Sequence, residues 1–374
     1  MAWPAAAVAP FGVPAAAPAF GTPASYGTPA GPADYDVPNP PGDCISSLAF
    51  SPKGAAATFL SATSWDKTVR VWGIQTAPAA DGSVSAVQAT PLGQQAGQLP
   101  LLTACMSKDG RCFYGGCDKT VTMWAVQTGQ VAPVAYHDQP ISHCEFVEDG
   151  VSAPMLITAA WDGKVRFWDL RQQTPAKEED FQAPVLHFDA STAPMATFLT
   201  SRKVHVYQLT TLTRFRDLEP VEAARFQFRR VSNFKDQSAV AAGTVDGRVV
   251  LWPLAAGQAG TQLKCHGGVL PGPTKDQYDA FPVNFVAVHP TGKKVVTGAS
   301  DGSVKLFDMG TKLPTIIQKE MPQTMAAGAM NAEGTLVAYA NSYDWSLGKE
   351  AYNPAVPNTL KIHAVTAADL APKK

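Results

Sequence analysis

Charge is scarce in this sequence, and its two signs almost cancel. Of the 374 residues, 16% are charged, with 30 Lys and Arg against 31 Asp and Glu, for a formal net charge of -1 at pH 7. A chain this close to neutral has no general attraction for nucleic acid, so any basic patch must be local. The 45% of hydrophobic residues suffices for a large core.

The six cysteines form neither a metal-binding nor a disulfide pattern. The closest pair, Cys112 and Cys117, is followed by no second pair at metal-ligand spacing, so we expect no metal site. Scattered cysteines in a long chain without a secretory signal favour a reduced intracellular compartment. The apolar N-terminus has no Lys or Arg before Lys53 and is interrupted by prolines, so we expect neither a signal peptide nor membrane insertion.

Sequence motifs of common enzymes are also missing. We find no Gly-x-x-x-x-Gly-Lys-Ser/Thr loop, no His-Glu-x-x-His and no Gly-x-Ser-x-Gly. The charged residues are spread through the chain and do not gather in one constellation. We therefore expect a non-enzymatic protein that needs no cofactor.

The composition divides the chain into three parts. Residues 1–33 consist mostly of Ala, Pro and Gly, which cannot build a core, and we expect a disordered tail. Its two Phe-Gly dipeptides, at Phe11 and Phe20, resemble those of nuclear-pore repeats, but they also arise easily from this composition. Residues 34–366 carry the repeats described next, and residues 367–374 are expected to be a short C-terminal tail.

A seven-residue phrase recurs along the chain, at intervals of 39 to 56 residues between its closing residues. An Asp-Gly or Asp-Lys start predicts a tight turn, and the Val-x-Val-aromatic run that follows predicts a strand. This period and this ending are typical of WD-repeat propeller blades. The copies end at Trp72, Trp124, Trp168, Tyr207, Trp252, Phe307 and His363.

Further β-rich runs precede each phrase, and no helical period separates the units. The sequence therefore predicts an all-β fold, a seven-bladed WD-repeat β-propeller. One thin sheet cannot bury both of its faces, whereas radial stacking gives every blade two neighbours. The last unit has only three strands, so we expect the stretch Tyr35-Asp36-Val37 to add its outer strand and close the ring.

Blade three has the residues of a buried hydrogen-bond chain. In WD repeats a His, a Ser or Thr, an Asp and a Trp satisfy one another inside an apolar sheet. Here they are His137, Thr158, Asp162 and Trp168. The pattern indicates a structural use of His and Asp, and the set is incomplete in the other blades.

With the repeats established, residues 43–366 resemble the WD-repeat mRNA-export factors of the nuclear pore, the Rae/Gle type. Four passages carry the resemblance: Ser64–Asp66 with Val69–Trp72; Tyr136–Ile141; Lys264–His266 with Pro282–Asn284 and His289–Pro290; and Ser342–Ser346 with Gly348–Glu350 and Tyr352–Pro354. The last is the most specific, because it stands where ordinary repeats have a two-residue turn. The Bub-type mitotic checkpoint propeller is a close cousin that shares the third passage.

The resemblance implies a docking platform. Such proteins bind a short GLEBS segment of an FG-repeat nucleoporin and take part in mRNA export and in mitotic spindle or checkpoint events. It also implies location in the nucleus and at the nuclear pore, with shuttling to the cytoplasm, and a monomeric propeller within a heteromeric complex. Direct binding of mRNA or of checkpoint proteins is a further possibility. Gly267 departs from the family, which usually has a basic residue there.

Six residues are candidates for partner binding. Trp65 and Trp161 stand at equivalent positions just before the turn Asp, and exposed tryptophans are enriched at interface hot spots. By resemblance, Arg248 beside Asp246 faces acidic residues of the nucleoporin segment, which a guanidinium holds bidentately. Arg229 and Arg230 make the stretch before it locally basic. Nearby acidic residues leave a solvated mixed surface as the alternative.

A different function is suggested by the phrase Trp168-Asp169-Leu170-Arg171. It fits the Trp-Asp-x-Arg box of substrate receptors for cullin-type ubiquitin ligases, with Trp168, Asp169 and Arg171 as its residues. Because Trp-Asp is the normal ending of a WD repeat, the box also arises from the repeat architecture alone. A ligase receptor and a Bub-type checkpoint propeller therefore stay open as alternatives.

Overall fold

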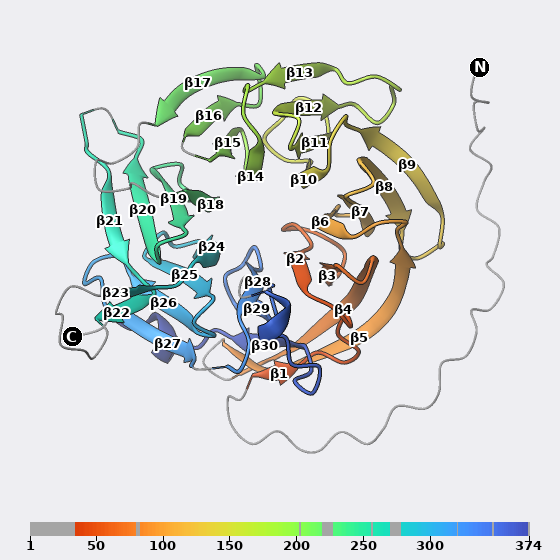
Figure 1. Ribbon diagram of the computed structural model, residues 1–374. Coiled ribbons are helices and arrows are strands. Elements are labelled where there is room, and N and C mark those ends of the chain that lie inside the picture. The colour runs from red at the N-terminus through yellow and green to blue at the C-terminus, as the bar shows by residue number, and fades with distance from the viewer. Residues whose placement is uncertain are drawn as a thin grey trace.

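The computed structural model describes residues 34–79, 83–201, 203–218, 227–255, 257–269, 278–319, 321–345 and 348–372. These residues form seven four-stranded antiparallel sheets, arranged as blades around a central channel (Figure 1). The expected tail, residues 1–33 with its Phe-Gly dipeptides, lies outside the described residues. The all-β, seven-bladed propeller predicted from the repeats is confirmed.

In each blade the strands follow one another from the channel outward. Blade 1 contains β2 (Ile45–Phe50), β3 (Thr58–Ser64), β4 (Thr68–Pro78) and β5 (Val84–Ala96). Blade 2 contains β6 (Leu101–Met106), β7 (Arg111–Gly116), β8 (Thr120–Ala125) and β9 (Val131–Tyr136). Blade 3 contains β10 (Ile141–Val147), β11 (Met155–Ala160), β12 (Lys164–Trp168) and β13 (Lys177–Asp180).

The remaining blades follow the same order. Blade 4 contains β14 (Val185–Thr192), β15 (Met195–Thr200), β16 (Val204–Gln208) and β17 (Thr213–Leu218). Blade 5 contains β18 (Phe228–Asn233), β19 (Ala239–Thr244), β20 (Arg248–Pro253) and β21 (Thr261–Lys264). Blade 6 contains β24 (Val283–Val288), β25 (Lys294–Ala299), β26 (Val304–Asp308) and β27 (Pro314–Gln318). A small hairpin, β22 (Gly267–Val269) with β23 (Tyr278–Ala280), lies between blades 5 and 6.

The recurring phrase forms the turn and the third strand of each blade. In blade 1 the Asp66 carboxylate accepts the Thr68 amide at 2.8 Å, and Lys67 between them has a φ of 70°. In blade 3, Asp162 accepts the Lys164 amide at 2.9 Å across Gly163. A side chain that hydrogen-bonds the backbone two residues ahead fixes such a turn, and this explains the Asp at the start of the phrase.

The core consists of apolar clusters between neighbouring blades. Between blades 3 and 4, for example, Phe167, Phe188, Phe198 and Tyr207 are almost completely buried. Each such side chain contributes about 1.5–3 kcal/mol by its removal from water. Each cluster contains residues from two neighbouring blades, so the packing between blades stabilises the ring.

The last blade closes the ring with a strand from the start of the propeller. It contains β28 (Met325–Met330), β29 (Leu336–Asn341), β30 (Thr359–Ala364) and, at the outer edge, β1 (Tyr35–Asp36). Tyr35 pairs with Ile362 and Asp36 with Lys361, and the Val37 amide donates to the Leu360 carbonyl at 2.8 Å. The closure predicted for Tyr35-Asp36-Val37 is therefore confirmed.

The C-terminal residues fold onto the propeller. The short helix α1 (Ala367–Leu370) begins at Thr366, whose side chain accepts the Asp369 amide in a capping box. Leu370 packs on the cluster between blades 6 and 7, and Lys294 donates to the Ala371 carbonyl at 2.9 Å. In the part of the chain that the structure describes, no helix has the length and apolarity to cross a lipid bilayer.

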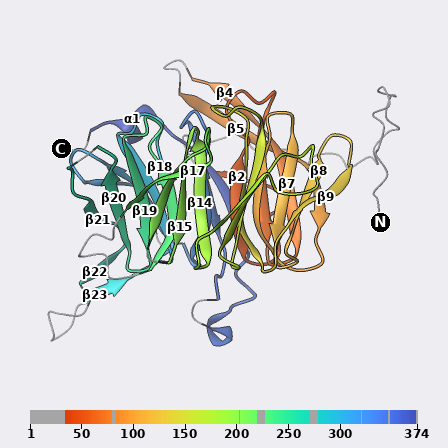
Figure 2. The same cartoon turned by 90° about the horizontal axis from the view of Figure 1, so that it is seen from above.

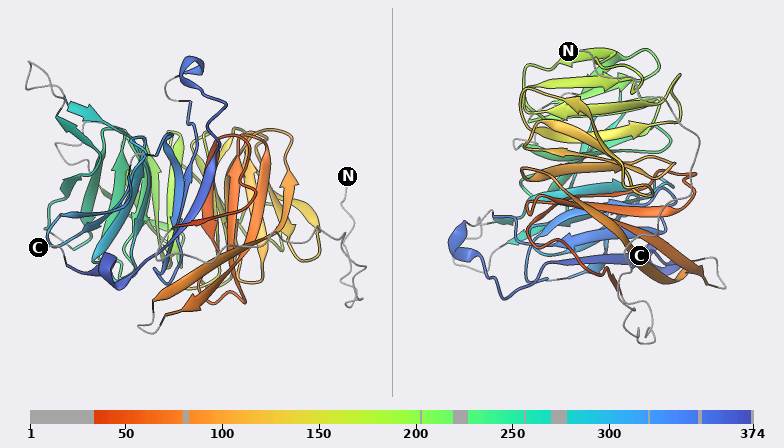
Figure 3. Two further views of the ribbon diagram at one scale, coloured as in Figure 1. Left: turned by 90° about the horizontal axis from the view of Figure 1, so that it is seen from below. Right: turned by 90° about the vertical axis from the view of Figure 1, so that its right-hand side faces the viewer.

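The two faces of the disc carry different connections. We call the top face the one that holds the turns between the second and third strands of each blade. The long insertion of blade 7 between β29 and β30, with the 3-10 turn Lys349–Ala351, and the β22–β23 hairpin project from it (Figures 2 and 3). Helix α1 and the connected ends of β4 and β5 lie on the bottom face (Figure 2).

Candidate functional site

Two tryptophans stand exposed in equivalent turns of the top face. Trp65 precedes the turn of blade 1 and Trp161 that of blade 3, and each is 44% exposed. The corresponding position in blades 2, 5 and 6 holds Cys117, Val245 or Ser300, none of which offers a large ring. Exposed indoles cost solubility unless a partner covers them, so this pair marks a candidate contact surface.

The insertion of blade 7 adds three more aromatic rings to the same face. Trp345 stacks on Tyr352 with ring centroids 5.0 Å apart, and Tyr343 lies 5.4 Å from Trp345 and 5.8 Å from Tyr352. Trp345 and Tyr352 are 43% and 42% exposed. Trp345 also adopts a φ of 59°, a strained conformation for a bulky residue. Sequence reasoning used this passage only for the resemblance and missed its rings as contact residues.

The base of the insertion is fixed to the start of blade 1. The Ser342 hydroxyl accepts the Ile45 amide at 3.1 Å, and the Asn358 amide donates to the Asp43 carbonyl at 2.9 Å. Within the insertion, the Tyr343 hydroxyl donates to the Gly348 carbonyl at 2.6 Å. These bonds tie the base of the insertion to Asp43 and Ile45 at the start of blade 1.

Arg248 and Asp246 form an internal pair in blade 5. The Arg248 Nε lies 2.8 Å from the Asp246 Oδ2, and Arg248 Nη1 donates to the Gln262 side chain at 2.9 Å. Asp246 is buried and also accepts the Thr244 hydroxyl. Asp246 and Gln262 thus hold the Arg248 side chain, which is 24% exposed, in one orientation. Asp246 positions Arg248 and is itself shielded from a partner.

Arg229 and Arg230 do not form an exposed basic surface with Arg248. Both are half-buried at the inner strand β18, and Arg230 lines the upper part of the central channel. Burial lowers the pKa of Arg229, against the opposing effect of Asp344 in the insertion. A bulge between Phe228 and Arg230 shifts the register of this strand. The arginines expected to form one basic surface patch therefore do not lie together, because Arg230 lines the channel and Arg248 does not.

The four residues of the blade 3 chain lie within hydrogen-bond distance. His137 Nδ1 is 3.0 Å from Asp162 Oδ2, and His137 Nε2 is 2.8 Å from the Thr158 hydroxyl. Trp168 Nε1 donates to the same hydroxyl at 2.9 Å. Burial lowers the pKa of His137, despite the charge of Asp162 beside it. The set joins the third strand to the incoming loop, and none of its residues lines the two cavities of the central channel.

Blade 6 contains a similar set that sequence reasoning missed. His266 Nδ1 is 2.9 Å from Asp301 Oδ2, and His266 Nε2 is 2.8 Å from the Thr297 hydroxyl. Burial raises the pKa of Asp301, but hydrogen bonds from His266 and Ser303 outweigh it and bring the value to about 2. The fourth member is absent because the position equivalent to Trp168 holds Phe307, whose side chain has no N–H to donate.

The Trp-Asp-x-Arg box lies after β12, on the bottom face. Trp168 is buried in the blade 3 chain, whereas Arg171 is 78% exposed and pairs with Asp169 at 2.6 Å. Of the three box residues, Asp169 and Arg171 are accessible to a partner protein. They lie on the face opposite to Trp65 and Trp161.

The described residues contain neither a candidate metal site nor a disulfide. They include no group of three or more His, Cys, Asp or Glu side chains placed to hold a metal ion. All six cysteines are free thiols. Cys105 and Cys144 have sulfur atoms 3.9 Å apart, and burial raises the pKa of Cys105.

Comparison with known proteins agrees with this architecture. The family model "WD domain, G-beta repeat" matches residues 38–73, 131–169 and 271–308. Protein Rae1 of Drosophila melanogaster is 32% identical over 322 residues, which cover 84% of this chain and 88% of that protein. The chain belongs to the family of Rae1/Gle2-type mRNA export factors.

Other Rae1/Gle2-type relatives extend over the same length. The Poly(A)+ RNA export protein of Schizosaccharomyces pombe is 31% identical, over 88% of this chain and 90% of the relative. The mRNA export factor GLE2 of Chaetomium thermophilum is 29% identical over the same shares. The similarity therefore extends over most of the chain.

Proposed function

We propose that this chain is a non-catalytic docking platform that supports mRNA export by holding a GLEBS-type segment of an FG-repeat nucleoporin on its top face. The observation that carries the proposal is the gathering of exposed Trp65, Trp161 and Trp345 on that face. The relatives named as mRNA export factors support the process. The partner is inferred from the resemblance described above.

The chemistry of the top face suits a peptide with apolar and acidic residues. The indole rings provide large, rigid contact area with few rotatable bonds to immobilise. Arg248, oriented by Asp246 and Gln262, presents its remaining guanidinium N–H groups to a carboxylate. Since His137 and His266 are used in buried hydrogen-bond sets, neither is available as a catalytic base.

A role at the nuclear pore follows from such a partner. We place the protein in the nucleus and at the nuclear envelope, with shuttling to the cytoplasm, as a monomeric propeller within a heteromeric complex. Contacts with mRNA or with mitotic checkpoint proteins are secondary possibilities of the same platform.

Isothermal titration of the full chain with two peptides tests the partner. One is a nucleoporin GLEBS segment and the other a GLEBS-type segment of a checkpoint kinase. We expect tighter binding of the nucleoporin segment. Preference for the kinase segment would move the protein to the checkpoint class, and binding of neither would remove the docking role.

A further inference from the structure

The upper end of the central channel contains a small cavity of about 60 Å³. It is lined by residues near the start of the inner strands, and at His143 and His187 it meets a wider cavity of about 360 Å³ that opens toward the bottom face. Three side chains at its wall matter here: Arg230 of β18, His187 of β14 and Asn284 of β24.

Arg230 has no acidic partner among the residues that the structure describes. The guanidinium forms one hydrogen bond with the described residues, a long one from Nη1 to the Arg229 carbonyl at 3.4 Å. Burial and the neighbouring charge of Arg229 lower the pKa of Arg230 to about 10. A cation that is partly withdrawn from water without a counter-charge destabilises the fold, and a bound anion would offset that cost.

His187 offers a second unused donor at the same cavity. Its Nδ1 accepts the Val231 amide at 3.4 Å, so in the neutral ring the proton resides on Nε2. We find no acceptor for Nε2 in the described ranges. Burial and the charges of His143 and Arg230 lower the pKa of His187, which keeps the ring neutral. His143, whose ring centroid is 4.1 Å away, is already bonded to Thr103 and Glu145.

Asn284 contributes an unused acceptor. Its Nδ2 donates to the Ser300 hydroxyl at 3.1 Å and to the Met325 carbonyl at 2.9 Å, which fixes the orientation of the amide. Its Oδ1 is buried and receives no hydrogen bond from the described residues. The cavity thus combines two unused donors, one of them charged, with one unused acceptor.

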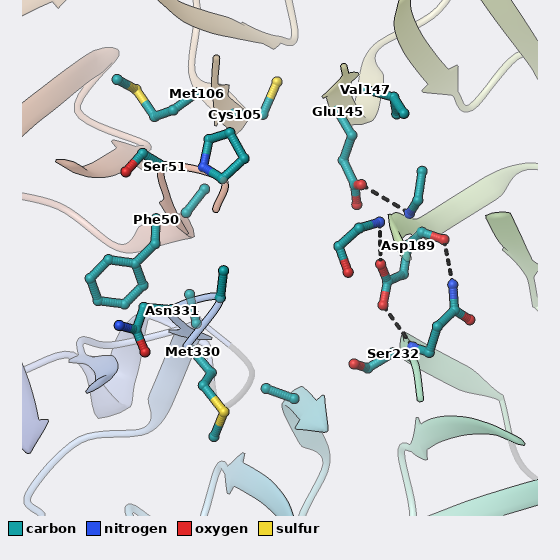
Figure 4. A pocket seen from close by; sticks show the side chains of 18 of the residues that line it. Phe50, Ser51, Cys105, Met106, Glu145, Val147, Asp189, Ser232, Met330 and Asn331 are labelled. Carbon is teal, nitrogen blue, oxygen red and sulfur yellow. Dashed lines mark hydrogen bonds between the residues drawn. The ribbon is translucent and has the colours of Figure 1, made fainter. Parts of the chain in front are cut away.

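The acidic residues of the channel lie at its wider end and are engaged there. Figure 4 shows Glu145 and Asp189 with their hydrogen bonds. Glu145 accepts the Ala190 amide at 2.9 Å, and Asp189 accepts the amides of Ser191 and Asn233 at 2.8 and 2.7 Å. Burial raises the pKa of Glu145. Neither carboxylate forms an ion pair with Arg230.

We propose that this upper cavity binds a phosphate group. Phosphate oxygens would accept from the Arg230 guanidinium and from His187 Nε2, and the hydroxyl of a protonated phosphate would donate to Asn284 Oδ1. The group is either free inorganic phosphate or a phosphomonoester carried by a larger molecule. The site is separate from the tryptophans of the top face, so it stands or falls independently of the nucleoporin partner.

Calorimetric titration of the full chain with inorganic phosphate tests the site, with sulfate and chloride at matched ionic strength. We expect saturable binding of phosphate, at least fivefold weaker binding of sulfate, which has no proton for Asn284, and none of chloride. Phenyl phosphate distinguishes the sources: binding at least as tight as that of phosphate indicates a carried phosphomonoester, and weaker binding indicates the free ion. Equal affinities for phosphate, sulfate and chloride would overturn the site.

Arg230→Gln is the decisive variant, and Arg229→Gln is its matched control. Removal of an uncompensated cation should raise the Tm of Arg230→Gln in the absence of phosphate and abolish phosphate binding. Arg229→Gln should bind phosphate within twofold of the unaltered chain. A lower Tm or loss of folding in Arg230→Gln without phosphate would mean that the charge is already balanced, and unchanged phosphate affinity would equally refute the site.

Discussion

His363 Nδ1 lies 2.6 Å from Asp34 Oδ1, so the third strand of the last blade is bonded to the first residue that the structure describes. On its other side, His363 Nε2 lies 3.3 Å from Asp369 Oδ2 in the C-terminal helix. The Tyr339 hydroxyl donates to Asp34 as well. One imidazole therefore joins both ends of the propeller, in addition to the pairing of β1 with β30.

This arrangement predicts a loss of stability in alkaline solution. Burial by itself lowers the pKa of His363, but the hydrogen bonds to Asp34 and Asp369 outweigh burial and raise it from 6.5 to about 9. A raised pKa means that the stabilisation is complete below pH 6.5 and disappears as the pH rises through 9. It amounts to about 3 kcal/mol. Denaturant unfolding from pH 6 to pH 10 measures it.

His363→Gln is the control for that pH profile. Its free energy of unfolding should be lower than that of the unaltered chain at pH 6, and the difference should shrink toward pH 10. Parallel profiles for the two proteins would show that His363 does not carry the effect.

The hydrogen-bond chain of blade 3 predicts unequal costs for two similar substitutions. Trp168→Phe removes a donor to Thr158, whereas Trp124 Nε1 in blade 2 is buried without an acceptor in the described residues. Both substitutions remove part of an indole from the core. We expect Trp168→Phe to lower the free energy of unfolding by about 1–3 kcal/mol more than Trp124→Phe, as measured by urea denaturation. Equal losses would contradict a stabilising role for this bond.

The strained backbone of Trp345 predicts a separation of stability from binding. Glycine adopts a φ of 59° without strain, so Trp345→Gly should leave the Tm unchanged or raise it. The same change removes the exposed ring and should weaken binding of the nucleoporin peptide by about tenfold. Phe215→Ala, at an exposed position on an outer strand, is the control. A fall in Tm with unchanged affinity would give Trp345 a purely structural role.

Local chemistry made the blades predictable from the sequence. In blades 1 and 3 the Asp of the phrase fixes its own turn, at Asp66 and Asp162, and the Val-x-Val-aromatic strand follows within a few residues. The partner strand β1 could be expected because a three-stranded last blade leaves an open edge. All of these features depend on neighbours in sequence or on the arithmetic of repeats.

The site was less predictable because it depends on contacts between distant segments. Arg230 lines the channel instead of the surface, since a bulge in β18 changes the alternation that the sequence suggests. Trp345 and Tyr352 stack only because Ser342 and Asn358 tie the insertion to blade 1. His266 and Asp301 were overlooked because the recurring phrase of their blade closes with Phe307 and not with Trp.

The measurement that tests the docking proposal most directly is the affinity of the nucleoporin GLEBS peptide for a double variant, Trp65→Ala with Arg248→Gln. Glutamine avoids the like-charge contact with Asp246 that a carboxylate would create. We expect the variant to unfold at about the same temperature as Phe215→Ala, and its Kd to rise by at least tenfold while Phe215→Ala binds normally. An unchanged Kd in the folded double variant would contradict docking on the top face.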